Sequence, residues 1–362
     1  MSSATGALPQ SSSRLSQPAA IRPKGFIASP GYDAFFIILA PAIALALAEV
    51  LSLFEAPFEV TDFLGTEERR ITIWIGVWTY AHLIAVGFRS HVNRDVYALH
   101  RIRFTLVPLM LFLALGASRW VFVTGFALAA LWDVYHTSMQ NFGFCRIYDS
   151  KAGNDAQSGR LLDVWLNHVI YIGPILGGLS LLPTLEVLAG YRDLGWNAPV
   201  EFLALIRTHA AVIRLTIVAA GTLFLLYYAF AYARLIRNGY TISRQKIALL
   251  FTTGTTSIYA WGFLPPLEAF FIANFFHGLQ YFAIVWWMEQ GNIRRVFGLS
   301  RIRHGNWLAL AAFVISVGSI GVVYQLENGY QLRWLGAAAI TVSLMHFWYD
   351  GFVWSVRKKQ MG

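Results

Sequence analysis

Long apolar segments alternate with short polar segments along most of the chain. Each apolar segment approaches the roughly 20 residues that an α-helix needs to cross a bilayer. Ten such segments are predicted as membrane-spanning helices, at residues 35–54, 71–88, 104–118, 120–144, 161–183, 211–233, 247–263, 267–289, 307–325 and 333–355. The pattern therefore predicts an all-α, polytopic bundle of about ten transmembrane helices.

The polar segments complete the domain organisation. Residues 1–30, rich in Ser, Gln, Pro and Ala, predict a disordered cytoplasmic tail. Residues 31–357 are predicted as a single transmembrane domain and residues 358–362 as a second cytoplasmic tail. In the longest outer connection, about 184–210, the segment 199–207 is predicted as a short helix at the membrane interface.

Basic residues are unequally divided between the two sides of this predicted bundle. Of the 28 Lys and Arg residues, 21 lie in the two tails and in the loops after the second, fourth, sixth and eighth spans. Because cytoplasmic loops carry an excess of Lys and Arg, both termini are predicted to be cytoplasmic. This is the pattern of a multi-pass integral membrane protein, here expected in a bacterial inner (plasma) membrane.

Composition excludes several classes of protein. The chain is 57% hydrophobic and only 13% charged, whereas a soluble domain carries about 25% charged residues. The net charge of +9 does not indicate nucleic-acid binding, since the basic residues lie beside spans, where they face anionic lipid. The single cysteine, Cys145, excludes an intrachain disulfide and a multi-cysteine metal site.

Histidines are the most informative polar residues inside the predicted spans. Five of the nine lie six to twelve residues from a cytoplasmic span end, which is a depth of roughly 9–18 Å at the helical rise. These candidate metal ligands are His82, His136, His168, His277 and His346. Their shared depth predicts a cluster in the cytoplasmic half of the bilayer.

Other polar residues lie near these histidines, several of them at helical spacing. Such neighbours commonly fix the orientation of a metal-bound imidazole. They are Asp133 and Gln140 around His136, Asn274 and Gln280 around His277, Asp350 after His346, and Tyr80 near His82. The two acids are candidate catalytic groups, and the amide and phenol side chains are predicted to support a bound cofactor. Arg89 and Arg146 are predicted to meet a lipid headgroup at the inner surface.

Imidazole and carboxylate ligands without thiolate favour non-haem iron, with zinc, copper or haem b also compatible. The predicted function is a metal-dependent membrane oxidoreductase, an oxygenase or hydroxylase of a lipid or isoprenoid, with an electron-donor protein as a further partner. Two alternatives stay open. The same residues are compatible with the relay of a transporter or proton-coupled carrier, and with polar packing between helices.

The spread of His82, His136, His277 and His346 over the spans resembles the histidine-rich integral-membrane non-haem iron oxygenases, in the style of the Brp/Blh-like β-carotene dioxygenases. The paired HxxxH and HxxHH boxes of membrane desaturases are absent. The resemblance implies iron-dependent oxidative cleavage or hydroxylation of a lipophilic substrate, with water excluded by aromatic-rich spans.

Overall fold

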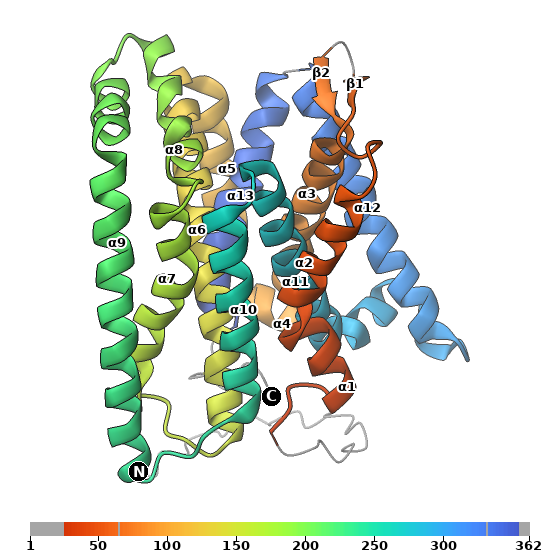
Figure 1. Cartoon of the computed structure of the whole chain (residues 1–362). Helices are drawn as coiled ribbons and strands as arrows, with labels where there is room; N and C mark the ends of the chain where they lie inside the picture. Colours follow the sequence, from red (N-terminus) through yellow and green to blue (C-terminus); the bar gives the residue numbers. More distant parts are fainter. Residues whose placement is uncertain (1–24, 64–65, 331, 355–362) are drawn as a thin grey trace, which may run out of the picture.

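The computed structural model describes residues 25–63, 66–330 and 332–354, so most of the predicted tails lie outside the described residues. Helices stand side by side along one common direction (Figure 1). In chain order the elements are α1 (Pro30–Asp33), η1 (Ala34–Ile38), α2 (Ala40–Ser52), β1 (Val60–Phe63), β2 (Thr66–Arg69), α3 (Arg70–Ser90), α4 (Arg94–Leu99), α5 (Arg101–Ala117), α6 (Arg119–Lys151), α7 (Arg160–Gly177), α8 (Leu181–Leu185), η2 (Glu186–Leu194), α9 (Ala198–Arg237), α10 (Arg244–Phe263), α11 (Pro266–Val296), η3 (Leu299–Arg301), α12 (Gly305–Tyr330) and α13 (Arg333–Val353).

The all-α prediction is confirmed, and each predicted span coincides with one long helix or one broken helix. Four helices, α3, α9, α11 and α12, are long and apolar enough to cross a membrane. Two bent helix pairs raise this number to six if each pair counts as one span. The core lies around α3 and α11, because buried apolar residues from both helices contribute to the two largest clusters.

The first predicted span, 35–54, is a broken helix in the structure. α1 and η1 join α2 at a 55° bend. Pro41 has no amide proton to donate to the carbonyl of Ile37 four residues earlier. The side chain of Gln280 donates to that carbonyl instead at 2.8 Å, and the hydroxyl of Thr252 donates to the carbonyl of Ile38 at 2.6 Å. Side chains of α11 and α10 therefore stabilise the break.

The predicted tail also ends earlier than residue 30. Ile27 and Ala28 are each only 4% exposed. Their backbone amides donate to the carboxylate of Asp33 at 2.6 and 2.9 Å. The described chain is therefore packed from Ile27, three residues before the predicted boundary.

The outer connection differs from the prediction. Residues 199–207 do not form a separate interfacial helix but belong to the 40-residue helix α9, since no Gly or Pro interrupts the chain between Pro199 and the next predicted span. α9 has no buried residue and lies at the edge of the bundle (Figure 1).

The fifth predicted span ends earlier than residue 183, because the chain bends by 99° between α7 and the α8–η2 segment.

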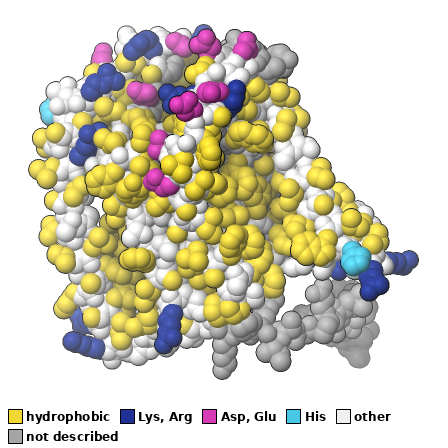
Figure 2. Space-filling view, turned by 45° about the vertical axis from the view of Figure 1, so that its right-hand side comes forward, with side chains coloured by type: hydrophobic (Ala, Val, Ile, Leu, Met, Phe, Trp, Pro, Cys, Tyr) yellow, Lys and Arg dark blue, Asp and Glu magenta, His cyan; other side chains and the backbone are white. Residues whose placement is uncertain are grey.

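The acidic segment before α3 contains a short hairpin that the hydrophobic pattern did not predict. β1 and β2 pair antiparallel, with Val60 opposite Arg69 and Phe63 opposite Thr66. The hairpin lies at the end of the bundle opposite the α6–α7 and α9–α10 connections (Figure 1). On the face shown in Figure 2, the acidic side chains gather at the hairpin end, where Lys and Arg side chains also lie. A broad hydrophobic band separates this end from the other, which carries Lys and Arg and is here named the basic end.

α3 and α12 approach each other closely at Gly321. A Cβ atom at this position would lie 2.4 Å from the backbone oxygen of Val77 and 3.1 Å from the backbone nitrogen of Ala81. Backbone atoms cannot move aside as a flexible side chain can. Glycine is therefore required at this crossing.

We expect Gly321→Ala to reduce the free energy of unfolding by about 1–3 kcal/mol, the usual cost of overpacking. Gly318→Ala on the same helix is the matched control, because a Cβ there meets nothing within 4 Å. Unfolding of the purified variants in mixed detergent micelles measures both values. Equal stability of the two variants would contradict this account of the crossing.

Candidate metal centre

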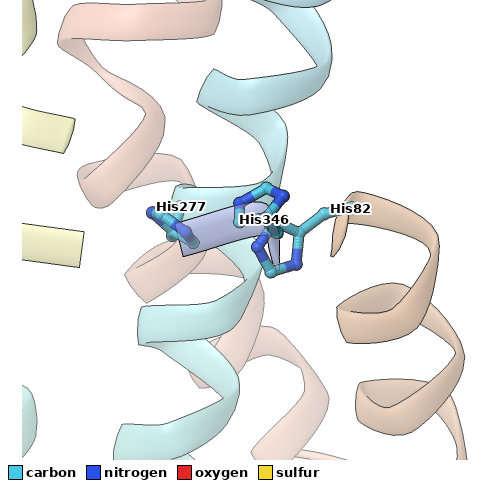
Figure 3. A group of neighbouring side chains, drawn as sticks. All are labelled: His82, His277 and His346. Carbon is cyan, nitrogen blue, oxygen red and sulfur yellow. The ribbon is translucent and has the colours of Figure 1, made fainter. Parts of the chain in front are cut away.

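Four of the five span histidines meet at the centre of the bundle. His82 lies on α3, His136 on α6, His277 on α11 and His346 on α13. Their rings pack edge to face in a closed circuit, with neighbouring centroids 4.8 or 5.0 Å apart. All four are at most 5% exposed. Figure 3 shows three of these imidazoles together, each reaching in from a different helix.

The ring nitrogens of this cluster are poorly satisfied by protein. In the described part of the chain, neither nitrogen of His277 has a hydrogen-bond partner. The nitrogens of His82 have none in normal hydrogen-bond geometry, although the backbone of Thr79 lies nearby. A buried polar atom without a partner costs about 1–3 kcal/mol. Ring nitrogens of His82, His277 and His346 lie within 4.8 Å of one another. Buried nitrogens that converge without partners fit a bound metal ion.

One hydrogen bond defines the state of His346. Its Nδ1 lies 2.9 Å from the backbone oxygen of Leu83, an acceptor, so Nδ1 carries the proton. The lone pair on Nε2 is then free to bind a metal, and a backbone acceptor of this kind commonly orients a ligating histidine. The Nε2 atom also lies 3.2 Å from Nε2 of His136.

The carboxylate of Asp350, on α13, also belongs to the cluster. One oxygen of Asp350 accepts hydrogen bonds from the Tyr281 hydroxyl at 2.8 Å and from the Trp354 indole at 2.9 Å. The other oxygen lies 3.7 Å from Nε2 of His136 and 3.8 Å from Nε2 of His346. Asp350 is therefore fixed through one oxygen and presents the other to the histidines.

The ligand atoms fit one metal ion rather than two. His136, His346 and Asp350 form a second group with ligand atoms within 4.8 Å, and it shares His346 with the first group. Because the Nδ1 of His346 is engaged by Leu83, only its Nε2 is available to both. A single lone pair binds a single ion, so the two groups describe one centre.

The predicted supporting amides contact backbone carbonyls and polar side chains, and none of these hydrogen bonds is to an imidazole ring. Gln140 donates to the carbonyl of His277 at 3.1 Å and to the side-chain oxygen of Gln280 at 3.2 Å. Asn274 accepts a hydrogen bond from the hydroxyl of Thr79 at 3.0 Å. These contacts fix α11 against α6 and α3, and so position the histidines indirectly.

Three further predicted site residues lie outside the histidine circuit. His168 belongs to neither ligand group, because its Nδ1 pairs with the hydroxyl of Ser138 at 2.8 Å. Ser138 is two residues from His136, about 200° around the helix, so it faces away from the cluster. Among the described residues, the carboxylate that lies beside His136 is that of Asp350 and not that of Asp133. The ring of Tyr80 packs on Tyr324 of α12, with 5.4 Å between centroids.

A buried ionic network, which the sequence pattern did not predict, lies at the basic end. Arg146 contacts the carboxylates of Asp149 at 2.6 Å and Asp163 at 2.9 Å. Lys246 contacts the same two carboxylates at 2.8 and 2.7 Å. Two cations thus balance two anions. Tyr240, between α9 and α10, donates to Asp149, and burial together with this hydrogen bond raises the pKa of its phenol.

The predicted headgroup role of two arginines is therefore wrong. Arg146 is 8% exposed and committed to this network, while Arg89 is 6% exposed and paired with Glu289 at 2.5 Å. A buried charge must find a counterion inside the protein, because desolvation is costly. Neither guanidinium is available to a lipid.

A cavity of about 640 Å³ opens beside the histidines. α6, α11 and α13 supply most of its walls, and the start of α7 lines the basic end. His136, Tyr281 and Asp350 line this cavity away from the basic end, and the rest of its wall is largely aromatic and aliphatic. The candidate metal centre is therefore open to a molecule the size of a small ligand.

Comparisons with protein families, curated proteins and solved structures give no match for this chain. The functional conclusions below therefore rest on the geometry and chemistry of the site.

We expect Lys246→Met to lower the free energy of unfolding by about 3–5 kcal/mol, because Asp149 and Asp163 would then share one buried cation. Arg70→Met is the matched control. Its ion pair with Glu59 is about half exposed, at 49% and 51%, and such pairs contribute about 1 kcal/mol or less. Thermal unfolding of the purified variants in detergent compares them, and similar losses would show that the network contributes no more than a surface pair.

Proposed function

We propose that the ten helices each cross a bilayer and that both termini are cytoplasmic. The support is the hydrophobic band on the face shown in Figure 2, together with the sequence asymmetry by which 21 of the 28 Lys and Arg residues lie in the tails and in the loops on one predicted side. The basic end would then be the cytoplasmic end, as in a multi-pass protein of a bacterial inner membrane.

We further propose that the protein is a membrane oxidoreductase with one non-haem iron, acting on a lipid or isoprenoid. The observation that carries this proposal is the convergence of four buried histidines. His82 and His277 have unpaired ring nitrogens, and His136 and His346 lie beside the carboxylate of Asp350. The donor set, imidazole and carboxylate without thiolate, suits iron more than a structural zinc site. When bound, the iron would supply oxygen activation, with a donor protein providing electrons for hydroxylation.

Each protein group has a specific task in this proposal. His82, His136, His277 and His346 would hold the metal, with His346 kept in one tautomer by Leu83. Asp350 would act beside the metal as a further ligand or as a proton acceptor at its free oxygen. The aromatic wall of the cavity, with Phe347 and Trp348 on α13, would exclude water from the reacting end of the substrate.

Purified protein is expected to contain close to one equivalent of iron. His346→Ala should lose most of it, to about a tenth or less, because His346 belongs to both ligand groups. His168→Ala is the control, since it removes a span histidine outside those groups and should keep the metal. Elemental analysis gives the result. A metal-free wild type, or equal loss in both variants, would refute the metal centre.

Two further measurements separate related metal chemistries. Haem b would give a Soret band, but a haem held between two facing histidines fits poorly where the Nε2 atoms of His136 and His346 are 3.2 Å apart. If the elemental analysis found zinc or copper instead of iron, the metal centre would be supported but the proposed reaction would change. Lipid extracts from cells producing wild type or His346→Ala should differ by an oxidised lipid.

A carrier is the second candidate, and the broken first helix supports it. Transporters often place discontinuous helices at the substrate site, and Gln280 links the break at Ile37 to Gln140 beside the histidines. Uptake of a labelled lipophilic substrate into vesicles, dependent on a proton gradient and unaffected by removal of metal, would favour the carrier over the enzyme.

A further inference from the structure

The cavity beside the histidines extends well beyond them, toward the basic end. Its α6 wall runs from Trp132 to Ser150, and the part from His136 to Ser150 covers about 21 Å at the helical rise. The cavity is therefore elongated in the direction of α6. This shape suits an extended chain with its ends in two different environments.

The far end of the cavity offers one available cation. Arg146 and Arg160 both line the cavity. Arg146 is saturated by Asp149, Asp163 and the loop carbonyls that it binds. Arg160 is exposed, lies over the ring of Phe142 at 5.5 Å, and forms no ion pair within the described residues. It stands at the start of α7, where the cap residue Gly159 supplies no side-chain hydrogen bond.

Two glycines leave the middle of the cavity open. Gly143 on α6 and Gly351 on α13 both line it. A Cβ atom built at either position meets nothing within 4 Å. Gly143 lies seven residues from His136 and seven from Ser150, about 10 Å from each. Free space thus continues from the histidines toward Arg160.

Charge differs between the two ends. Asp350, whose second oxygen faces the histidines, lies at the inner end, and Arg160 lies at the mouth. An anionic headgroup would pair with Arg160, since guanidinium binds carboxylate and phosphate by charge-assisted hydrogen bonds. The apolar wall between them suits a hydrocarbon chain.

We propose that this cavity binds a single-chain lipid with an anionic headgroup. The headgroup pairs with Arg160 at the basic end, and the chain passes between Gly143 and Gly351 with its far part beside His136 and Asp350. This inference rests on the proposed function in one respect, that the part of the chain beside the histidines is the part on which the metal acts. It identifies the substrate class as an anionic amphiphile and not a neutral hydrocarbon.

Native mass spectrometry of the full chain in detergent, with hexadecanoate as the probe and hexadecan-1-ol as its neutral counterpart, tests the proposal. Wild type should bind one hexadecanoate about tenfold or more tightly than the alcohol, the effect of one charge-assisted hydrogen bond. Arg160→Gln should abolish this preference. Gly143→Leu should weaken binding of both molecules, and Gly351→Leu provides the same test from the opposite wall.

Gly87→Leu is the matched control for the cavity-filling variants. Gly87 is also a helical glycine where a Cβ meets nothing within 4 Å, but it does not line the cavity. Its binding should equal that of wild type. Equal wild-type binding of acid and alcohol, or unchanged binding in both cavity-filling variants, would overturn the proposal. Displacement of hexadecanoate by inorganic phosphate, with no effect of either cavity-filling variant, would identify a free-anion site and overturn it also.

Metal content, measured on the same preparations, separates this inference from the proposed function. Metal-free protein that still selects hexadecanoate would refute the oxidoreductase and keep the lipid site. Protein that holds iron but does not distinguish the two probes would keep the metal centre and refute the anionic substrate.

Discussion

A polar group among packed apolar helices must find its partner inside the protein, because neither water nor lipid hydrocarbon at that depth supplies one. This constraint explains why the buried charged groups at the basic end are paired with one another. It also draws attention to the buried polar groups that have no partner. Arg146, Lys246, Asp149 and Asp163 satisfy one another, with tyrosine hydroxyls filling the remaining positions. The ring nitrogens of the histidine circuit are not all paired in this way. Both nitrogens of His82 and of His277 remain unpaired within the described structure, which is why the histidines, and not the larger ionic network, form the candidate centre.

α6 separates these two polar regions. On one face, His136, Gln140 and Gly143 line the cavity, and Gln140 also donates a hydrogen bond to α11. On the opposite face, Asn141 bonds to Asn167 of α7 and accepts from Thr253 of α10. The helix can be polar on both faces because each face is covered by other helices. Its exposed positions are mostly apolar, as a membrane surface requires.

The broken first helix connects the periphery of the bundle to its centre. Pro41 removes one backbone hydrogen bond, and Gln280 replaces it while also accepting from Gln140. Because Gln140 in turn donates to the backbone of His277, the position of the break and the position of one candidate ligand are mechanically linked. A rearrangement at the helix break would therefore shift His277, and a shift of His277 would alter the break.

The sequence by itself determined the helices and the depth of the polar groups along them. Apolar length located ten helical segments, and the distance of His82, His136, His277 and His346 from the span ends placed them at one level. Sequence periodicity also gives the face of a single helix on which a residue lies, but not which neighbour covers that face. The tertiary structure decided this. It turned His168 to Ser138 and away from the circuit. It also brought Lys246 to Asp149, 97 residues away. The physical reason is that helix rotation and contact are set by packing over the whole interface, whereas spacing along the chain reports only on one helix at a time.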